Sequence, residues 1–147
     1  MSLFNWFGKP SKITLNVLMQ DDSPITIREL LKLEEIQCRA DIIGAAVKLL
    51  QDQKHGQDGY NILGELAVEG DVDAQFLIGE VCESTLIRPE QAATWFQRAA
   101  DQGLAKAQRN YADMLMVGKG VSCDREKAFL YYTNVTLNGD EPKFIDL

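Results

Sequence analysis

Histidine and cysteine are scarce in this chain of 147 residues, which has one histidine, His55, and three cysteines. A single histidine excludes a histidine-based catalytic triad and a metal site with several histidines, unless a second chain contributes to it. Because the surrounding stretch is typical of a loop, we expect His55 at the surface. The cysteines are odd in number and unevenly spaced, which fits neither a disulfide framework nor a zinc site. We therefore expect no cofactor, no metal and a cytoplasmic protein with reduced thiols at Cys38, Cys82 and Cys123, of which Cys82 belongs to the core.

The chain also has fewer basic than acidic residues, and it has no long apolar run. Lys and Arg number 15 against 22 Asp and Glu, which gives a net charge of −7. The resulting field repels phosphate backbones and anionic membrane surfaces, and it favours a protein partner with a basic surface. The stretch before Pro10 lacks the apolar run of a secretory signal, and no later run approaches the length of a membrane span. We expect neither nucleic-acid binding nor stable membrane insertion.

What the sequence does contain is a helix-turn-helix pattern written twice between residues 70 and 139. Glycines at 70, 103 and 139 delimit two units that are 33 and 36 residues long. An alanine and a glutamine follow each opening glycine, and an aromatic pair precedes each closing glycine. The three extra residues lie between the halves of the second unit, where a repeat array tolerates an insertion. The recurring residues are Ala74-Gln75 and Ala107-Gln108, Ala92 and Ala128, and Trp95-Phe96 and Tyr131-Tyr132.

Helix limits within the two units have local causes. Pro89 suits a first helical turn, because its missing N–H would be unpaired there, and Asp124 is a good N-cap. Gly103 and Gly139 can take the left-handed conformation that ends a helix, and Gly118-Lys119-Gly120 predicts a turn. One helix pair cannot enclose its own apolar face, so adjacent pairs must stack, with the aromatic pairs filling the space between them. Small residues that allow this close approach are Ala74, Gly79, Ala92, Ala107, Ala112 and Ala128.

Four motifs carry a resemblance to a known family: G-D-V-D-A-Q, W-F-Q-R-A-A-D-Q-G, L-A-K-A-Q and G-K-G-V-S-C-D-R-E-K-A. They resemble the Sel-one-like repeat (SLR) family, a relative of the tetratricopeptide repeats. The resemblance is strong over residues 70–139 and faint over residues 40–69. The family's glycine-x-glycine-valine turn is present as Gly118-Lys119-Gly120-Val121, whereas the shorter stretch at Ser84 to Arg88 lacks it.

The resemblance implies a fold and a general role. The implied fold is all-α, a right-handed α-solenoid of stacked antiparallel helix pairs, with about two clear repeats plus a degenerate N-terminal one. The implied role is that of a non-enzymatic adaptor or scaffold, which binds another protein on the concave face lined by the first helix of each pair. Some bacterial relatives are secreted and have a disulfide in each repeat, but this chain lacks the paired cysteines.

The chain is expected to have four parts. Residues 1–24 form an N-terminal arm or irregular cap, residues 25–69 form N-terminal helices including a degenerate repeat, residues 70–139 form the two repeats, and residues 140–147 form a tail that covers the exposed apolar end. In the arm, the alternation of Ile13, Leu15 and Val17 is a weak strand signal that fits an extended segment equally well. Thr26 and Glu29 match a capping box and predict a helix start.

Two further helices are predicted before the clear repeats. Residues 40–53 have apolar residues at helical spacing, either as a second helix or as a continuation of the first. Residues 57–69 align with the second half of a repeat and predict the second helix of the degenerate unit.

Candidate binding residues lie at positions of the first helices that the repeat interior does not use, because these positions would face the groove. Apolar and Arg contacts would supply affinity, and acidic side chains would select a basic partner. The six candidates are Phe76, Glu80, Glu83, Arg109, Asp113 and Met116. The N-terminal aromatics Phe4, Trp6 and Phe7 either contact a partner or a membrane interface, or cover the first helices.

Enzymatic chemistry has no clear trace in the sequence. The turn at residues 118–120 lacks the spacing and the trailing Ser or Thr of a phosphate-binding loop, and carboxylate pairs such as Glu34-Glu35 are typical of helix starts and surfaces. A specific form of the adaptor hypothesis is a small acidic neutraliser of a toxin or effector. Two alternatives stay open: a hydrolase of the type proposed for secreted repeat relatives, and a self-assembling structural protein.

Overall fold

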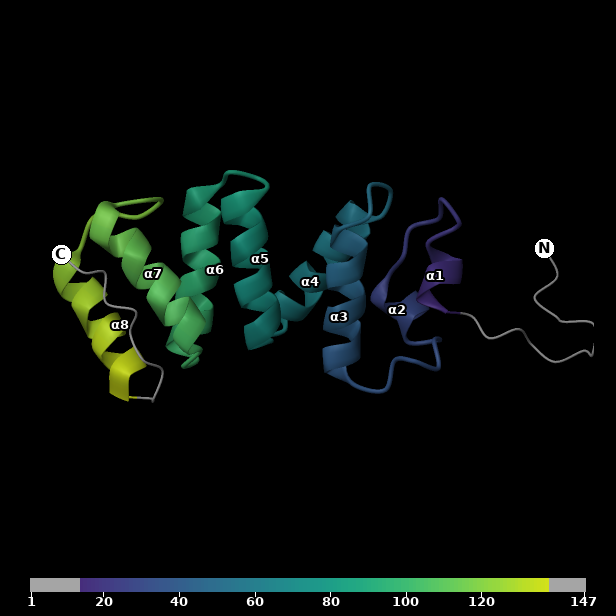
Figure 1. Cartoon of the computed structure of the whole chain (residues 1–147), viewed down its shortest axis with the longest axis horizontal. Helices are drawn as coiled ribbons and strands as arrows, with labels where there is room; N and C mark the ends of the chain where they lie inside the picture. Colours follow the sequence, from purple (N-terminus) through teal and green to yellow (C-terminus); the bar gives the residue numbers. More distant parts are fainter. Residues whose placement is uncertain (1–13, 138–147) are drawn as a thin grey trace, which may run out of the picture. The chain divides into compact units, whose positions relative to one another are not determined.

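A computed structural model describes residues 14–137, and this range contains eight helices and no strand (Figure 1). The all-α prediction is confirmed for these residues. The helices are α1 (Leu15–Leu18), α2 (Ile27–Leu30), α3 (Arg39–Leu50), α4 (Gly56–Val68), α5 (Val72–Ser84), α6 (Pro89–Asp101), α7 (Ala105–Val117) and α8 (Arg125–Leu137). Packing divides the chain into two compact units, residues 1–63 and residues 64–147. The predicted domain limits at residues 24 and 69 stay predictions.

The first unit begins with a helical turn, so the strand or extended segment predicted around Leu15 and Val17 was wrong. The N–H groups of Val17 and Leu18 donate to the Thr14 carbonyl at 3.0 and 3.1 Å, which closes the turn α1. Leu15 is buried whereas Val17 is 45% exposed, so only one side of this turn contributes to the core. Ile13 lies outside the described residues, as do Phe4, Trp6, Phe7 and the tail at 140–147.

The second helix is also a single turn. The Thr26 hydroxyl accepts the Glu29 N–H at 3.4 Å, which confirms Thr26 as the N-cap of α2. The helix ends at Leu30, and Leu31, which follows it, is 60% exposed. The open choice between a second helix and a continuation is settled, since α3 is a separate helix. The helix predicted over 57–69 is confirmed by α4, and its assignment to a degenerate repeat stays a prediction.

His55 is buried, with 2% of its surface exposed, and the prediction of a surface position was wrong. The stretch before α4 is not a flexible loop, because the Asp52 carboxylate accepts the His55 N–H at 3.0 Å and fixes the turn. The ring then lies between Asp58 on α4 and the backbone carbonyl of Asp21. The distant contact to residue 21 could not be read from local sequence.

The second unit consists of helix pairs in which α5 packs on α6, α6 on α7 and α7 on α8. Pro89 is the first residue of α6, and the Asp124 carboxylate accepts the Lys127 N–H at 2.9 Å at the start of α8, as predicted. Gly103 has φ +94° and ends α6 in the left-handed conformation, whereas Gly139 lies outside the described residues. Figure 1 shows these four helices side by side with short connections.

Small and aromatic side chains form the interior of this unit. The six small residues predicted for close approach are all buried. A Cβ atom on Gly79 would lie 2.7 Å from the Phe96 ring, so the fully buried Phe96 fills the space beside α5. The other three aromatics are only half-buried. The prediction that both aromatic pairs fill the space between helix pairs therefore holds fully for Phe96 alone, and Trp95, Tyr131 and Tyr132 each keep a solvent-facing side.

The repeated glutamines join each first helix to the helix before it. Gln75 donates its side-chain amide to the Ala67 carbonyl at 3.0 Å, and Gln108 donates to the Ala100 carbonyl at 3.2 Å. These carbonyls belong to last turns of α4 and α6, where intrahelical donors run out. Gln102 adds a second bond to the Gln75 side chain at 2.9 Å. The Ala-Gln pair thus recurs because it supplies both close approach and a buried hydrogen bond.

Candidate functional site

The six candidate residues occupy equivalent positions of α5 and α7. On each helix they are spaced by four and then three residues, which places them on one side of the helix. We call this surface the first-helix face. It consists of Phe76, Glu80 and Glu83 on α5 and of Arg109, Asp113 and Met116 on α7. In the structure Glu80, Asp113 and Met116 are exposed, and the other three are half-buried.

Phe76 contributes to the interior as well as to the first-helix face. Its ring centroid lies 5.6 Å from that of Phe96 with an interplanar angle of 48°, and it packs against the buried cluster of Ala99, Ala100 and Ala107. The premise that the repeat interior does not use this position was wrong. The reason is that Gly79, one turn further along α5, lets the Phe96 ring come close. A role of Phe76 in partner binding stays a prediction.

Glu83 is joined to the neighbouring repeat by an ion pair. The Lys119 Nζ lies 2.6 Å from the Glu83 Oε1, and the two side chains are 50% and 32% exposed. Lys119 stands between Gly118 and Gly120, whose φ angles of +73° and +70° shape the turn between α7 and α8. An ion pair this exposed contributes about 0–1 kcal/mol to stability, so its main effect is to position the two charges.

Asp113 accepts a hydrogen bond from the Tyr132 hydroxyl of α8. Burial raises the pKa of Tyr132, and the bond to Asp113 raises it further, so the phenol keeps its proton. Tyr131 behaves in the same way: its hydroxyl donates to Asp101 at 2.8 Å, and burial is the first cause of its raised pKa. The two tyrosines therefore act here as hydrogen-bond donors that orient carboxylates on the surface.

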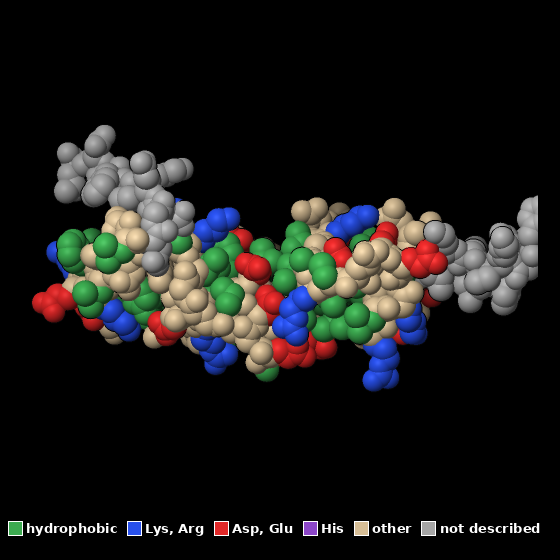
Figure 2. Space-filling view, turned by 90° about the horizontal axis from the view of Figure 1, so that it is seen from below, with side chains coloured by type: hydrophobic (Ala, Val, Ile, Leu, Met, Phe, Trp, Pro, Cys, Tyr) green, Lys and Arg blue, Asp and Glu red, His purple; other side chains and the backbone are tan. Residues whose placement is uncertain are grey.

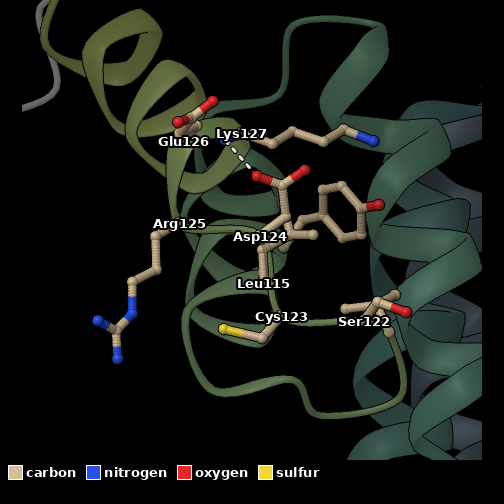
Figure 3. A pocket seen from close by; sticks show the side chains of 9 residues that line it. Leu115, Ser122, Cys123, Asp124, Arg125, Glu126 and Lys127 are labelled. Atoms are coloured by element: carbon tan, nitrogen blue, oxygen red, sulfur yellow. Dashed lines mark hydrogen bonds between the residues drawn. The ribbon is translucent and has the colours of Figure 1, made fainter.

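A hollow of about 480 Å³ lies beside the turn between α7 and α8, and the sequence did not predict it. Its walls come from α7, the turn and the start of α8, as Figure 3 shows. The Lys127 ammonium lies 5.6 Å from the Tyr111 ring centroid. Figure 3 shows the Arg125 side chain pointing away from that of Lys127. Lining residues are Tyr111, Leu115 and residues 121–127. Within residues 14–137, no group of three or more His, Cys, Asp or Glu is placed to hold a metal ion.

Exposed apolar side chains on α8 are a second feature that sequence reasoning missed. Figure 2 shows apolar side chains at the surface of the α8 end of this unit. Phe129 and Leu130 are 70% and 64% exposed. Ala93, the residue of α6 equivalent to Phe129, is 1% exposed, because α7 packs on α6. The sequence signal that could have indicated this surface is the large side chain of Phe129 at the position where the first repeat has Ala93.

Comparison with known proteins agrees with the geometry. The model of the Sel1 repeat matches residues 72–104 and 105–134. A Sel1 repeat protein from Oxalobacter formigenes has a similar structure, with a TM-score of 0.63 and 19% identity over 68% of this chain and 81% of that chain. A protective antigen present in uropathogenic Escherichia coli strains, which displays an SLR fold, has a TM-score of 0.60 and 21% identity over 68% of this chain and 23% of that chain. A search of curated proteins found no match.

The fold therefore defines an all-α repeat protein of the solenoid class. Residues 72–104 and 105–134 match the Sel1 repeat family, and these two repeats correspond to α5 with α6 and to α7 with α8. Proteins of this family are generally non-enzymatic modules that mediate protein interactions. None of the described helices is long and apolar enough to cross a membrane.

Proposed function

We propose that this protein is a non-enzymatic adaptor that binds a protein partner with a basic surface through the first-helix face. The observation that carries the proposal is the recurrence of an exposed carboxylate at one position of consecutive repeats. Glu80 and Asp113 are equivalent residues of α5 and α7, and both side chains are exposed. A partner that contacts both repeats would meet negative charge at the repeat spacing.

Charge supports this proposal both at long range and at the first-helix face itself. The net charge of −7 attracts a basic partner from a distance and speeds its association. At the face itself, Lys119 and Tyr132 hold Glu83 and Asp113 in fixed positions. Fixed carboxylates lose less conformational freedom on binding than mobile ones do. Met116, which is 39% exposed, adds an apolar contact beside them.

A finer form of the proposal is that the partner is a toxin or effector that this protein neutralises. Small size and acidic charge support it, since basic nuclease-like targets complement an acidic binder. We also propose that the protein is cytoplasmic. The absence of a disulfide among Cys38, Cys82 and Cys123 supports this location, because thiols persist in reducing compartments.

The proposal is tested by charge reversal on the first-helix face. The double variant Glu80→Lys with Asp113→Lys should lose a stoichiometric partner that the unchanged protein retains in a pulldown. Glu65→Lys is the control, because Glu65 is an exposed glutamate near the end of α4 and is not one of the residues of the first-helix face. Loss of the partner in the control as well would show an effect of net charge alone. Substrate turnover that survives the double reversal would favour the hydrolase instead.

Self-association is a second candidate function, favoured by the exposed apolar residues of α8. Phe129 and Leu130 lie on the helix that ends the second repeat, and they line a hollow together with Arg125 and Glu126. Light scattering of the purified protein should show dimers that Phe129→Ser with Leu130→Ser converts to monomers. A monomeric protein at all concentrations would exclude this candidate.

A further inference from the structure

His55 makes two hydrogen bonds inside the first unit that a neutral ring cannot make together. It immediately precedes α4 and is 2% exposed. Its Nδ1 lies 2.8 Å from the Asp58 Oδ2, and its Nε2 lies 3.0 Å from the backbone oxygen of Asp21. An ionised carboxylate and a backbone carbonyl only accept hydrogen bonds, and neutral imidazole has one N–H to donate. Only the doubly protonated imidazolium satisfies both partners.

The same contact attaches the segment between α1 and α2 to the start of α4. The Asp58 Oδ2 that faces His55 also accepts the Ile25 N–H at 3.1 Å, and Ile25 is buried. His55 reaches Asp21 four residues earlier in that segment. Loss of one ring proton would set a nitrogen lone pair against an oxygen lone pair at a buried position, where an unpaired polar group is costly.

Acidic residues lie near the ring in three parts of the first unit. Asp58 comes from α4, Asp52 from the turn before it, and Asp21 and Asp22 from the segment between α1 and α2. The cation Lys54 lies beside this group and is ion-paired with Asp22. The hydrogen bond to Asp58 is the largest cause that raises the pKa of His55 above its ordinary value, against the opposite effect of burial.

We infer that His55 is an imidazolium in the folded protein and that it makes the attachment of residues 21–25 to α4 dependent on pH. Because the ring gains acceptors on folding, its pKa is higher in the folded state than in the unfolded state. The stabilisation is then complete below the unfolded pKa, and it is lost as the pH rises through the folded pKa. Histidine is suited to this role because the ordinary pKa of its ring lies close to physiological pH.

Proton NMR tests the charge of the ring directly, because the chain has a single histidine and its Cε1–H resonance needs no assignment. The full chain is titrated from about pH 5 to 9 in buffer and again in urea, a window that includes the ordinary histidine pKa. We expect a higher midpoint in the folded protein and ring nitrogen shifts of an imidazolium below that midpoint. A folded midpoint at or below the unfolded one, or a neutral tautomer at about pH 6, would overturn the inference.

Hydrogen exchange tests the attachment. The protection factor of the Ile25 amide should fall as the pH rises, with the same midpoint as the ring. His55→Gln should abolish this pH dependence. Lys54→Met is the matched control, because it removes the ion pair to Asp22 and leaves both ring hydrogen bonds in place, so the transition should persist. Constant Ile25 protection across the titration of the unchanged protein would refute the attachment, even if His55→Gln failed to fold.

Discussion

Two glycines of one turn offer a matched test of how the second repeat contacts the first. Gly118 and Gly120 have nearly the same left-handed φ, +73° and +70°. A Cβ on Gly118 would meet its nearest atoms at 3.4 Å, which is ordinary contact. A Cβ on Gly120 would lie 2.3 Å from the backbone carbon and oxygen of Pro89. Gly120 therefore lets the α7–α8 turn lie directly on the start of α6.

Alanine at either position adopts a left-handed conformation, which costs about 1–2 kcal/mol. Gly120→Ala also forces two backbones apart, and overpacking of this kind adds about 1–3 kcal/mol. We therefore expect Gly120→Ala to lower the free energy of unfolding by about 1–3 kcal/mol more than Gly118→Ala does. The gain from a stiffer unfolded chain is shared by both variants and cancels in the difference.

Urea unfolding followed by the fluorescence of Trp95 measures this difference within the second unit. Trp6→Phe in all variants removes the other tryptophan from the signal. Equal losses of stability for the two variants would refute the close approach of the turn to Pro89. A larger loss for Gly118→Ala would show that conformational strain alone decides the outcome.

Three other substitutions test packing and strain in the same unit. Gly79→Ala should destabilise the protein by about 1–2 kcal/mol, because overlap with the Phe96 ring outweighs the gain in helix propensity. Gly64→Ala should instead stabilise α4 by about 0.5–1 kcal/mol, because its new Cβ would have nothing within 4 Å. Ile87→Asn should stabilise the protein by about 1 kcal/mol, because Ile87 is 79% exposed and has φ +51°, a conformation that asparagine adopts more readily. Thermal unfolding measures this gain, and no gain would show that contacts of the Ile87 side chain offset the strain.

The repeats were predictable because their signals are local and occur twice. Pro89 and Asp124 start helices through their own backbone and side-chain chemistry, without help from distant residues. The small residues marked close packing correctly, since each had a counterpart in the other copy. Aligning the two repeats with each other therefore compensates for weak signals in each of them. This explains why helix limits were easier to predict in the repeats than in the first unit.

Burial in the first unit and on the first-helix face depends on contacts with residues distant in the sequence, and local sequence patterns do not indicate these contacts. His55 is buried because residue 21 returns to it, and a polar local sequence gave no sign of that contact. The turn at Leu15 was predicted as a strand or an extended segment, because four residues are too few to show a helical period. On the first-helix face, the positions of Glu80 and Asp113 followed from repeat register, whereas the partial burial of Phe76 depends on where the Phe96 ring lies.

The most direct test of the proposed function compares quantitative pulldowns of three proteins: the unchanged chain, the Glu80→Lys and Asp113→Lys double variant, and the Glu65→Lys control. Partners are identified by mass spectrometry, and each bound amount is measured against the bait. The adaptor proposal predicts one basic partner near equal stoichiometry, retained by the control and lost from the double variant. Retention of that partner by a folded double variant would contradict binding through the first-helix face.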